Sequence, residues 1–226
     1  MLFEDQKFLE ILPTLKTCRS LLCLHGILPK YSFFSHFDLP IIATDGAYDL
    51  LRRKGIEADV VIGDDDSVKQ SVRAKTKKIV IKDQSLSDFQ KALHFTQTHD
   101  LSPSVILGVN GGYVDHILNN ISILAQSDSI GYMPPTLGLR IEHSLTLHLP
   151  QETKLSLFAL PSAKVHTRGL RWELKKYWLH FPQNHSCFNR TVNEFVEIEV
   201  EEGSIFLVIY LQDIIDAGKT AVGYEC

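Results

Sequence analysis

Acidic side chains follow three short apolar runs in the first half of the chain. Asp45 comes after LPIIAT, Asp64 to Asp66 come after ADVVIG, and Asp83 comes after KKIVIK, with Asp88 five residues further on. In an extended chain Asp64 and Asp66 face the same way, so the two carboxylates could share a hard cation through oxygen ligands. Any one such acid is as typical of a helix cap or a solvated turn. Together they predict a magnesium site that carries a nucleotide polyphosphate.

A glycine-rich segment, GVNGGYVDH over residues 108–116, lies between an apolar run and an amphipathic stretch. Glycine lets the backbone come close to a phosphate, and a helix that begins at Asp115 offers free N–H groups to an anion. The segment has neither the G-x-G-x-x-G pattern nor the Gly-Lys-Ser/Thr of a P-loop, which argues against a dinucleotide oxidoreductase and a P-loop kinase. His116 taken alone is more typical of a structural histidine than of a catalytic one.

Short apolar runs alternate with helix-length amphipathic stretches through the part of the chain that carries these residues. Strands are expected over 20–26, 39–44, 58–63, 77–82 and 104–109, and helices over 48–54, 87–98 and 115–126. Ser87 with Gln90 three residues later predicts a capping box. The alternation favours parallel strands joined by helical crossovers, whose carboxyl ends form the edge where ligands bind. We therefore expect residues 1–136 to form an α/β domain, a doubly wound and mostly parallel sheet with flanking helices.

The pattern changes after Pro134-Pro135 to short strands separated by Pro, Gly, Asn and Ser, with no convincing long helix. These strands are expected over 139–149, 154–160, 163–169, 195–200 and 204–211. Residues 137–226 are therefore predicted to form a C-terminal β-sandwich domain. Each half is small enough to bury only a modest core, so we expect the halves to pack on each other or on a second subunit.

Composition narrows the classes of function. The 226 residues include 23 Lys and Arg against 27 Asp and Glu, a net charge of −4, so no basic field favours nucleic acid as a partner. No apolar run reaches the roughly 18 residues of a membrane helix, and the acidic start MLFEDQKFLE is unlike a secretory signal. Four widely spaced cysteines form neither a disulfide framework nor a zinc motif. We expect a cytoplasmic protein with no nucleic-acid or membrane partner.

The order of the motifs resembles the thiamine pyrophosphokinase family. TDGAYDLL, ADVVIGDDDSV, DQSLSDFQKAL and GGYVDHILNNISIL match the family pattern ADGGAN, PDxIIGDFDS, DQDxTDLxKAL and GGRxDHxLxNI in order and spacing. Two segments beyond Pro135, GLRWEL over residues 169–174 and SCFN over residues 186–189, resemble its GLKWxL and S-x-S-N. The resemblance implies transfer of pyrophosphate from ATP to the thiamine hydroxyl, which gives thiamine diphosphate and AMP and requires Mg²⁺.

The resemblance also assigns roles to residues of this chain. It implies a catalytic cluster of acids, of which all but the first would hold the metal: Asp45, Asp64, Asp66 and Asp88. It implies an ATP site built from Asp83, Gln84, Ser87, Gly111, Gly112, Tyr113, Asp115, His116 and Asn120. Thiamine would bind to Trp172, Ser186 and Asn189 in a homodimer, with the Trp172 indole reaching the thiamine rings from the partner subunit.

Several positions depart from the family pattern. Tyr113 stands where the family has Arg, and Asp65 stands where it has Phe. Loss of that Arg would weaken the grip on ATP phosphate unless Lys82, Lys91 or Arg140 replaces it, or unless the tyrosine stacks on adenine. Two alternatives therefore stay open: a related pyrophosphokinase that acts on a hydroxymethylpterin, and a thiamine- or nucleotide-binding module without catalysis. Retention of the acidic cluster argues against the second, since grouped carboxylates repel one another.

Overall fold

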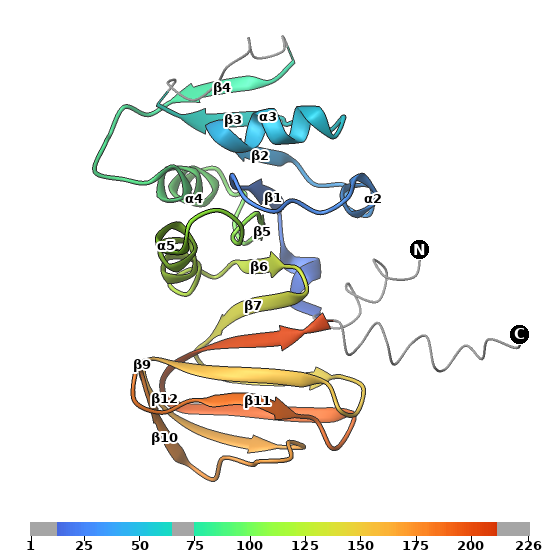
Figure 1. Ribbon diagram of the computed structural model, residues 1–226, viewed down its shortest axis with the longest axis vertical. Helices are drawn as coiled ribbons and strands as arrows, with labels where there is room; N and C mark the ends of the chain where they lie inside the picture. The colour runs from blue at the N-terminus through green and yellow to red at the C-terminus, as the bar shows by residue number, and fades with distance from the viewer. Residues whose placement is uncertain (1–12, 65–74, 212–226) are drawn as a thin grey trace, which may run out of the picture. The chain divides into compact units, whose positions relative to one another are not determined.

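The computed structural model describes residues 13–64 and 75–211 of the chain (Figure 1). The described residues divide into two compact units. The first spans Thr14–Met133, and the second begins at Pro134. Among the described residues no helix is both long enough and apolar enough to cross a membrane.

The first unit is built on a parallel sheet in the order β6-β5-β1-β2-β3-β4. Central strands β1 and β5 are buried at every position, as expected when helices cover both faces of a parallel sheet. Edge strand β4 is mostly exposed. The strands are β1 Ser20–Cys23, β2 Ile41–Thr44, β3 Val60–Gly63, β4 Lys77–Val80, β5 Ser104–Leu107 and β6 Ile130–Met133.

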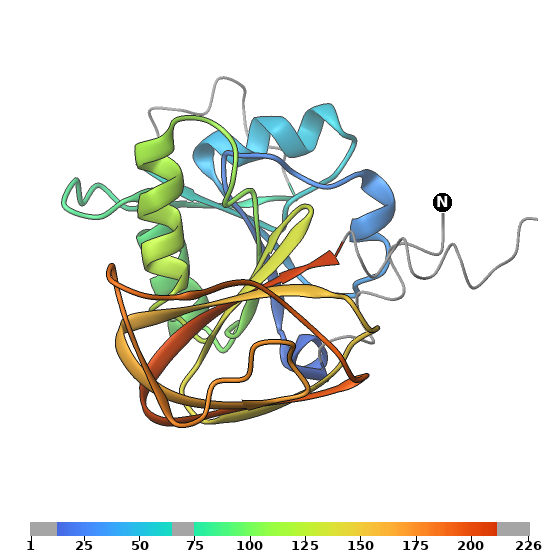
Figure 2. The same ribbon diagram turned by 60° about the horizontal axis from the view of Figure 1, so that its bottom comes forward.

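Helices lie on both faces of this sheet. The pair α4 and α5 lies side by side on one face, and α2 and α3 lie on the other (Figures 1 and 2). Right-handed crossovers require this arrangement, because the chain moves one way across the sheet from β1 to β4 and the other way from β4 to β6. The helices are η1 Pro13–Thr17 (3₁₀), α2 Tyr31–Phe34, α3 Asp45–Arg53, α4 Asp88–Thr98 and α5 Val114–Leu124.

The helix boundaries follow local chemistry. The capping box predicted at Ser87 is confirmed, since Ser87 Oγ accepts from the Gln90 N–H at 3.3 Å and Gln90 Oε1 accepts from the Ser87 N–H at 3.0 Å. Helix α3 begins at Asp45, three residues before the expected start at Tyr48. A carboxylate in the first turn is favoured by the helix dipole, so Asp45 belongs to the helix and not to the strand end before it.

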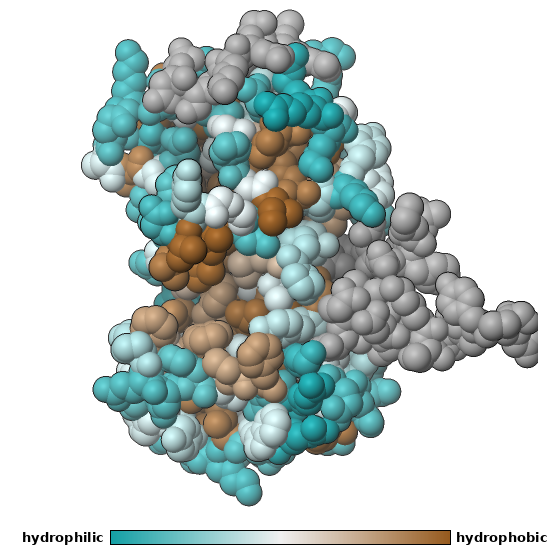
Figure 3. Space-filling model, viewed as in Figure 1, coloured by the Kyte–Doolittle hydropathy of each residue, from teal (hydrophilic) through white to brown (hydrophobic). Residues whose placement is uncertain are grey.

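Helix α5 has an apolar face that is open in the described residues. Val114 is 72% exposed and Leu118 is 62% exposed. The two side chains are four residues apart and therefore lie on the same face of the helix. Figure 3 shows a hydrophobic patch over this helix. A row of apolar side chains on one helix face is the usual pattern of a surface that packs against something else.

The second unit is an antiparallel β structure made around two long strands. β12 pairs with β9 along most of its length, and the two strands bend together at register shifts near Val200 and Gly203. The strands are β7 Thr136–Ile141, β8 Ser144–His148, β9 Lys154–Arg168, β10 Tyr177–His180, β11 Ser186–Arg190 and β12 Phe195–Tyr210.

The two halves of these long strands belong to two layers. The first half of β9 and the second half of β12 join β11 and β7, while the other halves join β10 and β8 (Figure 2). The expected fold class, a parallel α/β sheet followed by a β-sandwich, is confirmed. The expectation of separate strands over 154–160 and 163–169, and over 195–200 and 204–211, was wrong. Pro161 and Gly203 lie at bends within continuous strands, where proline and glycine are tolerated.

Replacing Ile106 with alanine tests the core of the first unit. Ile106 is 0% exposed in the central strand β5, so Ile106→Ala should lower the free energy of unfolding by about 2–5 kcal/mol through lost burial and a cavity. The matched control is Val80→Ala on edge strand β4, where the side chain is 43% exposed and the loss should be about 1 kcal/mol or less. Equal losses in urea unfolding followed by circular dichroism would contradict this assignment of the core.

Candidate active site

A cavity of about 840 Å³ opens at the carboxyl ends of the parallel strands in the first unit. It lies where β1 and β5 are neighbours, although the chain leaves β1 toward α2 on one face and leaves β5 toward α5 on the other. The connections after the two strands therefore diverge and leave a crevice between them. Such a switch point is the usual ligand site of an open α/β sheet.

Backbone contact between the segments after β1 and β5 forms the floor of this crevice. A Cβ atom on Gly26 would overlap the carbonyl oxygens of Gly108 and Asn110, so only glycine fits there. The Ile27 N–H donates to Asn110 O at 2.7 Å, and the Leu24 N–H donates to Leu107 O at 2.8 Å. The two segments are thus held together without any side chain between them.

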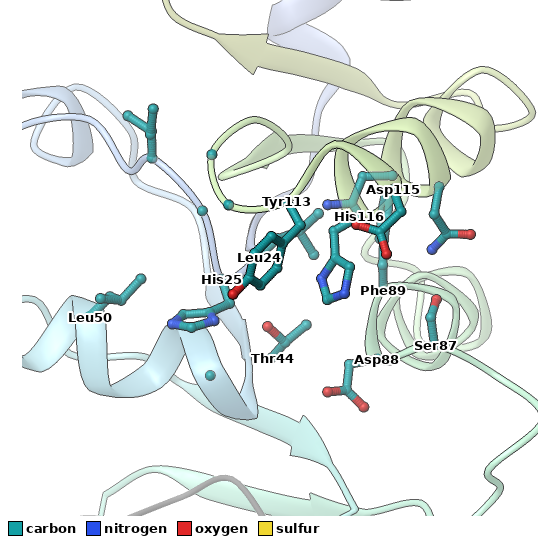
Figure 4. Close-up of a pocket in the computed structure, with 17 residues that line it drawn as sticks. Leu24, His25, Thr44, Leu50, Ser87, Asp88, Phe89, Tyr113, Asp115 and His116 are labelled. Carbon is teal, nitrogen blue, oxygen red and sulfur yellow. The ribbon is translucent and has the colours of Figure 1, made fainter.

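Eight of the residues that the sequence assigned to catalysis or ATP binding line this cavity. They are Ser87, Asp88, Gly111, Gly112, Tyr113, Asp115, His116 and Asn120. In the view of Figure 4, the ring of Tyr113 lies between the imidazoles of His25 and His116. Asn120 Nδ2 donates to Val109 O at 3.2 Å, so helix α5 fixes the loop that carries the glycines.

Two further acids of the predicted cluster, Asp45 and Asp64, lie at the neighbouring strand ends. Asp45 is buried, and the register that pairs Thr44 with Ile62 brings it against Gly63, where an added Cβ atom would overlap the carboxylate. Asp64 follows Gly63, and its Oδ2 accepts from Gln84 Nε2 at 2.9 Å. Asp66 lies outside the described residues.

The two acids next to α4, Asp88 and Asp83, each have a partner that fixes the carboxylate. Asp88 Oδ1 lies 3.1 Å from the ammonium of Lys91, a side chain that is only 2% exposed. Asp83 Oδ1 accepts from the hydroxyl of Ser85 at 2.6 Å and from its N–H at 2.8 Å. These bonds, with a smaller contribution from the Lys91 charge, hold the pKa of Asp83 below its usual value. Asp83 is therefore a charged acceptor fixed in a turn.

The donor set suits a hard divalent cation. Within residues 13–64 and 75–211, no three His, Cys, Asp or Glu side chains form a metal cluster by themselves. Mg²⁺ in phosphoryl-transfer sites usually takes one or two carboxylates, and phosphate oxygens and water supply the rest. Asp88 at the cavity and Asp64 at the end of β3 supply oxygen donors of that kind, so the residues present fit Mg²⁺.

The three residues expected to bind thiamine lie together in the second unit. Trp172 is 58% exposed in the loop between β9 and β10, and Asn189 is 1% exposed on β11. Asn189 Nδ2 donates to Ser186 Oγ at 3.0 Å, and its amide also bonds the backbone of Trp172. The buried amide of Asn189 therefore holds the backbone of the residue whose indole is exposed.

Sequence reasoning missed the residues that follow β1. Leu24, His25, Gly26 and Ile27 all line the cavity. The run SLLCLHG was recognised as a strand, but its end carries no acid, and only the adjacency of β1 and β5 brings His25 to the site. The sequence at the end of a single strand does not show which strand lies beside it, so it could not place His25 at the cavity. Thr44, Gly46, Leu50, Phe89 and Asn119 complete the lining.

Two family models match the chain. Residues 33–132 match "Thiamin pyrophosphokinase, catalytic domain", and residues 142–205 match "Thiamin pyrophosphokinase, vitamin B1 binding domain". The chain belongs to the thiamin pyrophosphokinase family. The prediction drawn from the motif order is thereby confirmed, including the enzyme class and ATP as co-substrate of the family reaction.

Proteins of this family are similar to the chain over most of its length. Thiamine pyrophosphokinase 1 of Arabidopsis thaliana is 27% identical over 228 residues, which cover 84% of this chain and 85% of that protein. The thiamin pyrophosphokinase structures from yeast and Candida albicans match with TM-scores of 0.73 and 0.75 at 21% and 15% identity. They cover 88% of this chain each, and 88% and 92% of their own chains. The structural likeness shows a shared fold.

Of the two named departures from the family motif, Tyr113 lines the cavity, and Asp65 lies outside the described residues. Tyr113, which replaces the family Arg, is 78% exposed, and its ring meets the His116 ring edge-on at 6.1 Å. Lys91, one of the cations considered as a substitute, contacts Asp88, whereas Arg140 pairs with Glu142 within the second unit. The cavity thus has aromatic rings at the position of the family guanidinium.

A methyl group at Gly63 should damage the acidic cluster without unfolding the sheet. Because the added Cβ atom would overlap the buried Asp45 carboxylate, Gly63→Ala should lower kcat for thiamine diphosphate formation by about tenfold or more. The matched control is Gly55→Ala, which strains a positive φ of 74° but places nothing within 4 Å of the new atom, so it should cost stability and leave kcat unchanged. Equal kcat values for the two folded variants would contradict the role given to Gly63.

Proposed function

We propose that this chain transfers the pyrophosphoryl group of ATP to the hydroxyl of thiamine at the cavity between β1 and β5, which gives thiamine diphosphate and AMP. One observation carries the proposal. The Asp88 carboxylate and the Gly111-Gly112 loop, which come from two different crossovers, line the same cavity at the switch point. A polyphosphate needs acids to hold its cation and open backbone to hold its oxygens, and both are supplied there.

The ATP phosphates lie against the start of α5 in this proposal. Gly111 and Gly112 have φ values of 103° and 86°, a conformation that glycine adopts without strain and that leaves backbone N–H groups accessible. Helix α5 begins at Val114 with no side-chain cap, so its first N–H groups can bind an anion. Asp83 and Gln84 hold the turn beside α4 and keep Asp64 in place through the Gln84 amide.

Mg²⁺ would be held by Asp64, Asp66 and Asp88. When bound, the ion neutralises charge on the phosphate oxygens during transfer. The acceptor oxygen of thiamine forms a bond to the β-phosphorus as the bond from that phosphorus to the bridging oxygen of AMP breaks. A carboxylate of the cluster formed by these acids and Asp45 accepts the proton that the hydroxyl loses.

The adenine would stack on Tyr113. Its ring is exposed at the cavity mouth and is flanked by the rings of His25 and His116 in the view of Figure 4. An aromatic ring gives the flat purine a stacking surface but supplies no charge for a phosphate. We therefore propose that Asp115, His116 and Asn120 shape the nucleotide side and that phosphate binding relies more on backbone N–H groups here than in relatives that have the Arg.

Thiamine would bind at the surface that Trp172 presents, with the Ser186 and Asn189 side chains behind it, in a homodimer whose interface includes the site. The thiazolium ring is cationic and is attracted to the face of an indole. The exposed indole of Trp172 and the open apolar face of α5 support this arrangement, because both are the kind of surface that a second subunit covers. Residues 1–136 would then form the nucleotide domain and residues 137–226 the thiamine domain.

Neutralising single acids tests the metal and phosphate assignment. Asp88→Asn, Asp64→Asn and Asp66→Asn should each lower kcat by about a hundredfold or more with the fold retained, because each removes charge where the transition state needs it. Asp128→Asn is the matched control, since Asp128 is exposed at the other end of the strands, next to β6, and bonds only Ser102 among the described partners. Normal AMP release by any of the three variants would remove that acid from the cluster.

Removing the Trp172 indole tests the thiamine surface. Trp172→Ala should raise the KM for thiamine about tenfold, in line with a cation–π interaction of ~0.5–2 kcal/mol, and should change the KM for ATP much less. The control is Trp178→Ala, because Trp178 is also exposed, at 40%, but stacks on His180. An unchanged thiamine KM in Trp172→Ala would return Trp172 to a packing role.

A further inference from the structure

The loop that carries Trp172 continues the pairing of the second unit by an unusual route. Leu170 pairs with Thr191 as an isolated bridge, and the Arg171 N–H donates to Arg190 O at 2.8 Å. If this antiparallel pairing continued, Trp172 would lie opposite Asn189. At this position the Trp172 main chain bonds the Asn189 side chain instead of the Asn189 main chain.

The Asn189 amide bonds both main-chain groups of Trp172. Its Oδ1 accepts from the Trp172 N–H at 3.2 Å, and its Nδ2 donates to Trp172 O at 2.7 Å. The remaining capacity of the amide is also used, since Oδ1 accepts from the Arg190 N–H at 2.9 Å and Nδ2 donates to Ser186 Oγ at 3.0 Å. A primary amide has two donors and two acceptor positions, so all of them have a protein partner.

A bulge in β11 turns this side chain inward. The register of β11 against β9 shifts between Ser186 and Asn189, and Phe188 between them has a φ of 51° with its side chain 58% exposed. The following residue, Asn189, is 1% exposed. Bulges next to functional sites commonly redirect one side chain in this way.

We propose that Asn189 is a positioning residue that acts on thiamine through Trp172, by locking the backbone of an otherwise irregular loop so that the indole is presented in one orientation. This rests on the proposed thiamine site. It replaces the direct contact to thiamine expected from the sequence, because the amide has no donor or acceptor left over. The exposed indole also has the Arg171 guanidinium 5.9 Å from its ring centre, and Glu152 holds that guanidinium in an ion pair. The guanidinium lies over one face of the indole, so stacking of the cationic thiazolium is favoured on the other face.

The test is Asn189→Asp in a Trp178→Phe background, where Trp172 is the only tryptophan. Aspartate has the same shape but no N–H to give to Trp172 O, so the loop should loosen. We expect the Kd for thiamine, measured by quenching of Trp172 fluorescence, to rise about tenfold while the KM for ATP changes less than about twofold. Iodide should also quench Trp172 more strongly in the protein without ligand, which a residue that only touches thiamine would not cause.

Asn184→Asp is the matched control. The Asn184 amide makes the same kind of pair in the neighbouring loop, where Oδ1 accepts from the His180 N–H at 2.7 Å and Nδ2 donates to Trp178 O at 3.0 Å. It should leave both the thiamine Kd and the iodide quenching unchanged. If Asn189→Asp does not fold, Ser186→Ala removes one partner of the amide and should give the same changes at smaller size.

The outcomes separate this inference from the proposed function. Weaker thiamine binding with greater iodide quenching in Asn189→Asp supports the positioning role. If Asn189→Asp binds thiamine more weakly but its iodide quenching is unchanged, Asn189 is a direct ligand. If Asn189→Asp binds thiamine normally while Trp172→Ala does not, Asn189 has only a structural role. Either result overturns the inference and leaves the thiamine site standing. No effect of Trp172→Ala would overturn both.

Discussion

The contact between the chain segments after β1 and β5 is the constraint on which the site depends. Gly26 and Gly108 bring two backbones together with no side chain between them, and hydrogen bonds from Leu24 and Ile27 keep them there. Because the chain then leaves in opposite directions toward α2 and α5, a crevice opens above this contact. Any side chain at Gly26 would separate the segments and close or distort the floor of the cavity.

The acidic cluster depends on the same sheet in a second way. Parallel register brings the ends of β2 and β3 side by side, so Asp45 lies on Gly63 and Asp64 follows directly. Grouped carboxylates repel one another, and the protein balances part of this charge with Lys91, which is almost fully buried beside Asp88. The proposed binding of Mg²⁺ and a polyphosphate would balance the remaining charge.

Much of this could be predicted from the sequence, because the decisive signals were local. Apolar runs followed by acids gave the parallel strands and their rim, and Ser87 with Gln90 gave a helix start to the residue. What could not be predicted depended on partners distant in the chain. Strand β6 is defined by its pairing with β5, and His25 reaches the cavity only because β5 lies next to β1.

The second unit shows the same limit. Pro161 and Gly203 have the composition of turns, yet continuous pairing between β9 and β12 carries both strands through them. The role of Asn189 depends on a loop 17 residues away, and on a bulge that no local pattern marks. Motif order singled out Trp172, Ser186 and Asn189, and the structure brings the three together, but the motif gave no sign that the Asn189 amide bonds the Trp172 backbone.

The most direct test of the account is turnover by the purified chain with ATP, Mg²⁺ and thiamine, in which AMP and thiamine diphosphate are quantified together by chromatography. A hydroxymethylpterin is offered as the competing acceptor, and a reaction with chelator serves as the control. The account predicts AMP and thiamine diphosphate in equal amounts, only with Mg²⁺, and no product from the pterin. Thiamine binding without either product, or transfer to the pterin alone, would contradict it.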